Sequence, residues 1–163
     1  MDFNVQKCKV MHVGKQDSCS YYMGGMKLTE DEVEKDLGVW ISSDIKYSQQ
    51  CIHAFKKASR VMGMIKRTIR FTEVRIMMSL YKTLVRPHVE YCVSAWSPYY
   101  KKDKELLEKV QRRFTKMIIN MEGLSYEDRL QSLKLWSVEE RRNRQDLIEV
   151  FKMAKGMTRI RLQ

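Results

Sequence analysis

The sequence has little proline and glycine and no long apolar run. Its 163 residues include 2 Pro and 7 Gly, which excludes collagen-like and loop-dominated classes. No apolar stretch approaches the ~20 residues of a membrane span, and residues 1–10 lack the apolar core of a secretory signal, so we expect no membrane partner. The 4 Cys are far apart without a CxxC pair, which indicates reduced thiols. We therefore expect an intracellular protein, in the cytoplasm or the nucleus.

The short motifs of several enzyme classes are also missing. The chain has no G-x-S-x-G, no P-loop and no H-E-x-x-H. The closest thiol and imidazole spacings, Cys8 with His12 and Cys51 with His53, do not supply the four ligands of a zinc site. No two aspartates are adjacent, so the usual carboxylate pair of a two-metal polymerase is missing. We expect no metal site and no cofactor in this chain.

The net charge of +11 is concentrated in the later part of the chain. Residues 1–46 hold 6 Lys and Arg against 8 Asp and Glu, and residues 47–163 hold 25 against 12. The charges are therefore −2 and +13, and we place a domain boundary between residues 46 and 47. Such an asymmetry favours a polyanionic partner for the second part. A well-solvated basic helical surface is the alternative.

Residues 1–46 show the patterns of short strands. Residues 10–13 alternate apolar and polar side chains, and Gly24-Gly25 separates two further short runs, which is a hairpin signal. Residues 37–41 form a β-branched and aromatic run that suits a buried strand. The acidic stretch 30–36 is expected to be a solvated connection. The predicted class is α+β, with a short antiparallel β piece followed by a mostly helical bundle.

A cationic helix is predicted over residues 48–69. On a helical wheel, Ala58, Met62 and Ile65 fall opposite the cations, and there is no acid between Tyr47 and Phe71. Like charges four residues apart repel, so a purely solvated helix usually mixes signs. The candidate nucleic-acid-binding residues of this helix are Lys56, Lys57, Arg60, Lys66, Arg67 and Arg70.

A second, apolar helix is predicted from an N-cap at Thr72 to Trp96, with a kink or break at Pro87. Tyr81 and Trp96 are expected in the core. Tyr99 follows this helix in an exposed Tyr-Tyr-Lys-Lys run, where its ring could stack on a base.

A third helix, predicted over residues 103–121, carries a second basic face opposite its apolar side. The candidates on that face are Lys109, Arg112, Arg113 and Lys116.

Two helices are predicted at the end of the chain. Ser125 opens a short helix to residue 133, and Ser137 with Glu140 makes a capping box for a last helix that ends before Gly156. Arg141, Arg142 and Arg144 lie near the start of that helix, where the helix dipole disfavours cations. Residues so placed are expected either to meet a partner or to pair with Glu139 and Glu140.

Several stretches resemble the reverse transcriptase of non-LTR (LINE-class) retrotransposons. The most specific is residues 80–92, LYKTLVRPHVEYC. The others are residues 3–14 (FNVQKCKVMHVG), 36–41 (DLGVWI), 96–98 (WSP), 107–116 (LEKVQRRFTK) and 126–130 (YEDRL). Together these stretches span most of the chain in the order of the family.

The resemblance implies the end of a polymerase palm in residues 1–46 and a helical thumb in residues 47–163. Asn4-x-x-Lys7 is similar to palm motif D, whose lysine is a proposed proton donor to pyrophosphate. Leu37, Gly38 and Val39 resemble motif E, the primer grip. The thumb of such a polymerase tracks a template–primer duplex, which fits the charge asymmetry. The resemblance thus implies a non-specific RNA or DNA partner.

The family's Asp-Asp turn, which precedes motif D and holds Mg²⁺ in the parent polymerase, is missing from this sequence. We therefore expect a truncated frame in which Met1 is an internal methionine, and we expect the chain alone to be inactive as a polymerase. Two other readings remain open. The first is a helical protein-interaction module, which would self-associate through the surface that the missing palm leaves open. The second is a non-functional relic frame.

Overall fold

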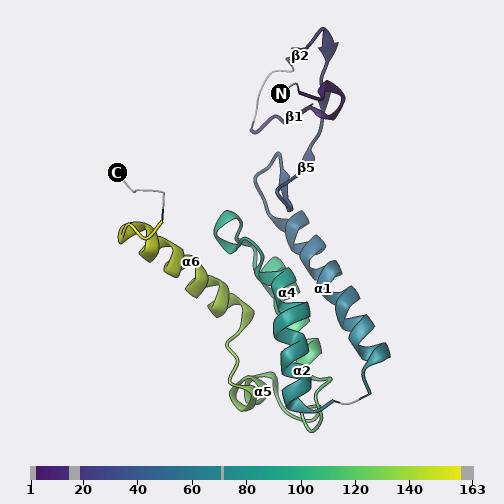
Figure 1. Ribbon diagram of the computed structural model, residues 1–163, viewed down its shortest axis with the longest axis vertical. Coiled ribbons are helices and arrows are strands. Elements are labelled where there is room, and N and C mark those ends of the chain that lie inside the picture. Colours follow the sequence, from purple (N-terminus) through teal and green to yellow (C-terminus); the bar gives the residue numbers. More distant parts are fainter. Residues whose placement is uncertain (1–2, 15–18, 71, 159–163) are drawn as a thin grey trace. The chain divides into compact units, whose positions relative to one another are not determined.

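The computed structural model describes residues 3–14, 19–70 and 72–158. Internal contacts divide the chain into two compact units, Met1–Gln50 and Cys51–Gln163, which we call the strand unit and the helical unit. Short strands and long helices occur together (Figure 1), which confirms the α+β class. The two units are described separately.

The strand unit is built from three pairs of very short strands. They are β1 (Lys9–Val10), β2 (Tyr22–Met23), β3 (Met26–Lys27), β4 (Thr29–Glu30), β5 (Val33–Asp36) and β6 (Val39–Ser42), after a 3₁₀ turn η1 (Val5–Lys7). β2–β3 and β5–β6 are antiparallel hairpins, whereas β1 and β4 pair in parallel. The expectation of a purely antiparallel piece is therefore wrong for β1 and β4. The β2–β3 hairpin supplies the long connection that a parallel pair needs.

Both hairpins turn through residues with positive φ. Gly24 and Gly25 have φ of 57° and 77°, as the primed turns of tight hairpins require, which confirms the Gly-Gly hairpin. Leu37 and Gly38 turn the β5–β6 hairpin with φ of 43° and 90°. The strand expected from residue 37 therefore begins only at Val39, because residues 37 and 38 are used by the turn.

The acidic stretch 30–36 is not a solvated connection, contrary to expectation. It holds the end of β4 and the whole of β5. The Lys9 Nζ atom lies 2.7 Å from Asp31 Oδ2 and 2.6 Å from Glu34 Oε2. This cation holds the pKa of both carboxyl groups below the usual range through side-chain hydrogen bonds. A lysine far away in sequence thus offsets the repulsion that would otherwise keep the stretch open.

The helical unit begins at Cys51, so it includes all of α1 except the first three residues. Its elements are α1 (Ser48–Thr68), α2 (Val74–Leu80), a π-helical segment η2 (Tyr81–Val85), α3 (Arg86–Glu90), a 3₁₀ turn η3 (Val93–Ala95), α4 (Lys101–Thr115), α5 (Tyr126–Leu133) and α6 (Val138–Ala154). In α1, Ala58, Met62 and Ile65 are buried, which confirms the apolar face predicted opposite the cations.

The second predicted helix is present in part. Its N-cap is Glu73 rather than Thr72, and it ends at Glu90 rather than Trp96, because Cys92 adopts a left-handed conformation with φ of 54°. Pro87 is accommodated by the π-helical segment that precedes it, in which the Arg86 N–H donates to the Tyr81 carbonyl five residues back.

The aromatic residues expected in the core are there. Tyr81 and Trp96 are both fully buried, and the Trp96 indole donates to the Tyr91 carbonyl. Tyr99 is exposed as expected.

The third helix ends at Thr115, earlier than the predicted residue 121. The Ile119 N–H donates to the Thr72 carbonyl at 3.0 Å instead of continuing the helical ladder. Met117 and Ile118 already donate three residues back, to Phe114 and Thr115, so the helix has ended in a turn before this long-range bond is made.

Both predicted caps at the end of the chain are confirmed. Ser125 accepts from the Asp128 N–H, and Ser137 forms the full capping box with Glu140. Gly156 follows α6 with φ of 64°, as a C-terminal glycine should.

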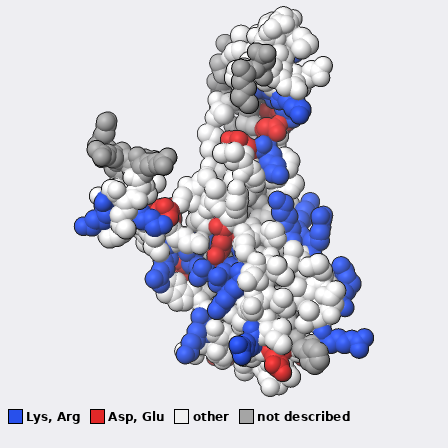
Figure 2. All heavy atoms as spheres, viewed as in Figure 1, with Lys and Arg blue, Asp and Glu red and all other residues white. Residues whose placement is uncertain are grey.

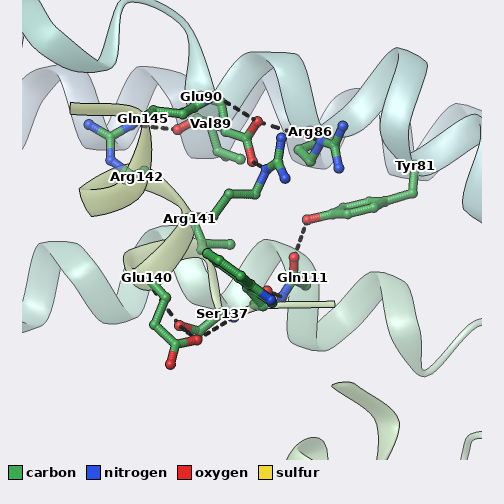
Figure 3. Close-up of polar contacts among 12 residues, drawn as sticks. Tyr81, Arg86, Val89, Glu90, Gln111, Ser137, Glu140, Arg141, Arg142 and Gln145 are labelled. Atoms are coloured by element: carbon green, nitrogen blue, oxygen red, sulfur yellow. Dashed lines mark hydrogen bonds and ion pairs between the residues drawn. The ribbon is translucent and has the colours of Figure 1, made fainter. Parts of the chain in front are cut away.

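A buried polar chain connects the helices inside the unit, and Figure 3 shows its bond between Tyr81 and Gln111. The Tyr81 hydroxyl donates to Gln111 Oε1 at 2.6 Å, and Gln111 Nε2 donates to the Tyr126 hydroxyl and to the Trp136 carbonyl, each at 2.9 Å. The Tyr126 hydroxyl donates to Glu108. Burial raises the pKa of both tyrosines, so their phenols stay protonated donors. The polar side chains of this chain are thus paired with one another inside the core, which offsets the cost of burying them.

Arg142 is the central anchor of α6. Its side chain is 3% exposed, lies 3.9 Å from the Trp96 ring centre, and donates to the Val89 and Trp96 carbonyls at 2.6 and 2.7 Å. Burial lowers its pKa to about 10. Arg141 donates to Glu90 at 2.5 Å (Figure 3). These two arginines hold the fold rather than a partner.

The acids near the start of α6 do not pair with those arginines, contrary to the other expectation. Glu139 accepts from Lys104, and Glu140 accepts from the backbone and hydroxyl of Ser137. The capping geometry holds Glu140 at the helix N-terminus and so keeps it away from the arginines.

Candidate nucleic-acid interface

The cations singled out in the sequence are all at the surface. None of them forms an ion pair with any residue that the structure describes. They are Lys56, Lys57, Arg60, Lys66, Arg67, Arg70, Lys109, Arg112, Arg113 and Lys116. Other lysines and arginines, such as Lys9 and Lys104, are paired with acids. The ten cations are therefore available to an external anion.

The α1 stripe consists of Lys56, Arg60, Arg67 and Arg70. The first three lie on the helix, and Arg70 follows its end at Thr68. The stripe lies opposite the buried face of α1, so the core does not compete for these side chains. Figure 2 shows blue atoms along the outer edge of α1 in the helical unit, with no acid between them.

The helices α1 and α4 lie side by side and run in the same direction. Near their beginnings, Cys51 and Asp103 are close enough to interact electrostatically. Near their ends, Lys66 lines the same groove as Arg113. This arrangement brings the basic last turns of both helices to one end of the unit.

The basic groove between these helix ends has a volume of about 550 Å³. Cations from both helices line it, namely Lys66, Arg113 and Lys116. Its apolar lining comes from Met62, Ile65, Ile69, Met77 and Met117, and one acid, Glu122, also contributes. Arg113 is oriented by the Phe55 ring, whose centre lies 5.6 Å from the guanidinium carbon. The groove therefore offers several phosphate contacts over a short distance.

The helix dipoles support part of this positive charge. Lys66 and Arg67 lie in the last turn of α1, and Arg112 and Arg113 in the last turn of α4. Cations near a helix C-terminus are stabilised by about 0.3–1 kcal/mol. The dipole thus explains why cations are tolerated at these ends, but not why Lys56 and Arg60 stand one turn apart in the middle of α1.

The predicted basic face of α4 is divided by the structure. Arg113 and Lys116 face the basic groove, whereas Lys109 and Arg112 line a second, shallow groove of about 430 Å³ together with Lys102. On α1, Lys57 lies apart from the stripe, near His88, whose pKa is lowered by burial and by this lysine.

The family-derived residues lie in the strand unit. Lys7 is exposed in η1, with its N–H bonded to the Asn4 carbonyl. Leu37, 86% exposed, and Gly38 form the tip of the β5–β6 hairpin, whereas Val39 is buried at 6%. Of this set, Leu37 is the side chain that the turn presents to solvent.

Within residues 3–14, 19–70 and 72–158, no three His, Cys, Asp or Glu side chains lie together as a metal site needs. Over the same ranges, no helix is long and apolar enough to cross a membrane.

Sequence reasoning missed the apolar lining of the basic groove and the part played by Lys102. A helical wheel shows each helix alone, so it cannot show that Met77 and Met117 line the same groove as cations of α1 and α4. The Tyr-Tyr-Lys-Lys run at 99–102 was the one available signal for Lys102.

The chain shows a distant similarity to a known protein. A Caenorhabditis elegans protein named "Uncharacterized protein B0403.1" is 24% identical over 110 residues, which is 66% of this chain. The match spans 56% of the length of that protein. No protein-family model matches the chain, and no solved structure matches it.

Proposed function

We propose that the helical unit binds nucleic acid without sequence preference, through phosphate contacts of the α1 stripe and the basic groove. The observation that carries the proposal is that ten exposed cations have no acid paired with them in the described part of the chain. Lysine and arginine contacts to phosphates give affinity that is independent of sequence and falls with salt. A surface whose purpose was solubility alone would more often mix charges of both signs.

The test is a titration of a labelled DNA duplex, followed by fluorescence anisotropy at several salt concentrations. The K56E/R60E/R67E variant should bind about 100-fold more weakly at low salt, and its salt slope should fall by about 2–3, because three phosphate contacts are lost. The matched control is K134E/K152E/K155E, which changes the net charge equally on α5 and α6. We expect it to lose less than about fivefold.

Two results would overturn the proposal. Affinity that does not change with salt would exclude phosphate contacts. Equal losses in both triple variants would show that overall charge matters and that the α1 stripe has no special role.

We also propose that the chain corresponds to the palm end and thumb of a LINE-class reverse transcriptase, without polymerase activity of its own. The motif stretches support the correspondence, and the missing pair of adjacent aspartates supports inactivity. Magnesium-dependent primer extension by the pure chain would contradict it. In this proposal, the exposed Leu37 at the hairpin tip takes the place of a primer-grip residue.

A second candidate function, a protein-interaction module, is favoured by the later part of α6. Leu147, Val150 and Phe151 are all more than half exposed there, and they recur at helical spacing. Self-association through this face should appear as a concentration-dependent shift in size-exclusion chromatography. A chain that stays monomeric at high concentration would remove self-association from consideration.

A further inference from the structure

The segment between η3 and α4 carries an aromatic pair that the core does not use. Tyr99 is 88% exposed, and its ring meets the Tyr100 ring edge-on, with the centres 5.5 Å apart at 80°. The Lys102 Nζ atom lies 5.4 Å from the Tyr100 ring centre. Exposing a whole tyrosine ring gives up its burial energy, so Tyr99 contributes little to folding in this position.

A line of cations leads away from this pair along α4. Lys102, Lys109 and Arg112 line the second groove with Leu106 and Glu105. No acid in the described residues forms an ion pair with any of the three cations, while Glu105 lies 3.9 Å from Lys101. Arg112 is held by the Tyr126 ring, whose centre lies 4.8 Å from the guanidinium carbon. The charges therefore lie on a rigid helix, and the one acid in the groove is partly compensated.

The dimensions fit a short single strand. At ~1.5 Å rise per residue, Lys102 and Arg112 are roughly 15 Å apart along the helix. That length suits a segment on the order of four nucleotides, at the lower end of known single-strand sites. In a duplex the bases are stacked on one another, so an exposed tyrosine has no free base to contact. In a single strand, each base offers a face for stacking.

We propose that Tyr99 and the α4 groove form a binding site for single-stranded nucleic acid, with a base stacked on Tyr99 and phosphates on Lys102, Lys109 and Arg112. This site rests on the proposed nucleic-acid function, and it is distinct from the α1 stripe and the basic groove. It adds a preference: a single strand here, and a duplex on the α1 side.

The test compares a labelled twelve-nucleotide oligothymidine with a duplex of equal length by fluorescence anisotropy. The Tyr99→Ala variant should bind the single strand about 10-fold more weakly, since stacking on one aromatic residue has about this effect. Its salt slope and its duplex affinity should not change. Tyr99→Phe should bind like the wild type, because the ring is kept. K102E/K109E should weaken single-strand binding and lower its salt slope.

The outcomes separate this site from the wider proposal. The single-strand site is wrong if Tyr99→Ala binds the single strand as the wild type does, or if it loses affinity for the single strand and the duplex equally. Duplex binding through α1 is tested separately, by the α1 variants. If the wild type binds neither probe, both proposals are wrong. If it binds an acidic peptide in preference to the oligothymidine, the α4 groove is a protein site instead.

Discussion

The strand unit and the α1 stripe of the helical unit use their charges in opposite ways. In the strand unit, Lys9 is bonded to Asp31 and Glu34, and Lys46 lies 3.5 Å from Asp44. In the helical unit, the stripe of α1 has no acid paired with it among the described residues. Charges that are paired within a unit support its fold, and charges left unpaired in a row are free for a partner. The comparison therefore marks the α1 stripe as a candidate binding surface, although the sequence holds none of the catalytic motifs sought.

The units also differ in what holds them together. Among the described residues of the strand unit, 3–14 and 19–50, the buried apolar side chain is Val39. The helical unit buries many apolar side chains, including Tyr81, Trp96 and Phe114. The strand unit thus depends on surface ion pairs and short strand pairings. The helical unit depends on apolar packing and on a buried network in which Tyr81, Gln111 and Tyr126 bond to one another.

The largest effect should come from removing a buried anchor of the helical unit. Arg142→Ala leaves the Val89 and Trp96 carbonyls without their donors and removes the stacking on Trp96, so the free energy of unfolding should fall by on the order of 3 kcal/mol. Urea unfolding followed by circular dichroism measures this loss. The matched control is Arg144→Ala, whose exposed side chain lies over Trp136 and should cost about 0.5 kcal/mol.

An equal, small loss in both arginine variants would break the comparison, since it would show that buried polar bonds matter no more than surface contacts in the helical unit.

Local patterns predicted much of the fold, and long-range pairings account for most of what they missed. The capping box at Ser137 and the Gly24-Gly25 hairpin depend on neighbours in sequence, so they could be read directly. The ion pair of Glu34 in β5 depends on Lys9, which lies in another segment. The path of the chain after the third helix depends likewise on the Thr72 carbonyl, which accepts from the Ile119 N–H. No single-segment pattern contains such partners.

The candidate site was likewise predictable within one helix but not between helices. The wheel of α1 found its cations and its buried face, because both follow from one helical period. It could not find that α4 divides its cations between two grooves, since this depends on how α1 packs beside α4.

A second, smaller effect is that the stability of the two units should depend on pH in different ranges. Burial raises the pKa of the Cys51 thiol from 9.0 to about 12. The folded state therefore holds this proton more tightly than the unfolded state, and the resulting stability is complete below pH 9 and is lost as the pH rises toward 12. Between about pH 8 and pH 10, this group should cost the helical unit on the order of 1 kcal/mol.

Comparing the wild type with Cys51→Ala in urea titrations at both pH values isolates this loss, because the variant lacks the thiol and keeps the other titrating groups. The strand unit should respond at the other end of the scale. The lowered pKa values of Asp31 and Glu34 stabilise it above their unfolded pKa and cease to do so in acid. A wild type that loses no more stability than Cys51→Ala at alkaline pH would show that the thiol is not buried as described.

The smallest effects test the comparison most directly. They place the same substitution at Lys9, which is paired with acids, and at Lys56, which belongs to the α1 stripe. Lys9→Glu places a third carboxylate beside Asp31 and Glu34, so β4 and β5 should lose protection from amide hydrogen exchange. Lys56→Glu removes a repulsion with Arg60 four residues later and creates a favourable pair, so the helical unit should keep its stability or gain about 0.3 kcal/mol. The same Lys56 variant should bind a DNA duplex more weakly. If Lys56→Glu instead destabilised the helical unit, the cations of α1 would belong to the fold, and the distinction between paired and available charge would fail.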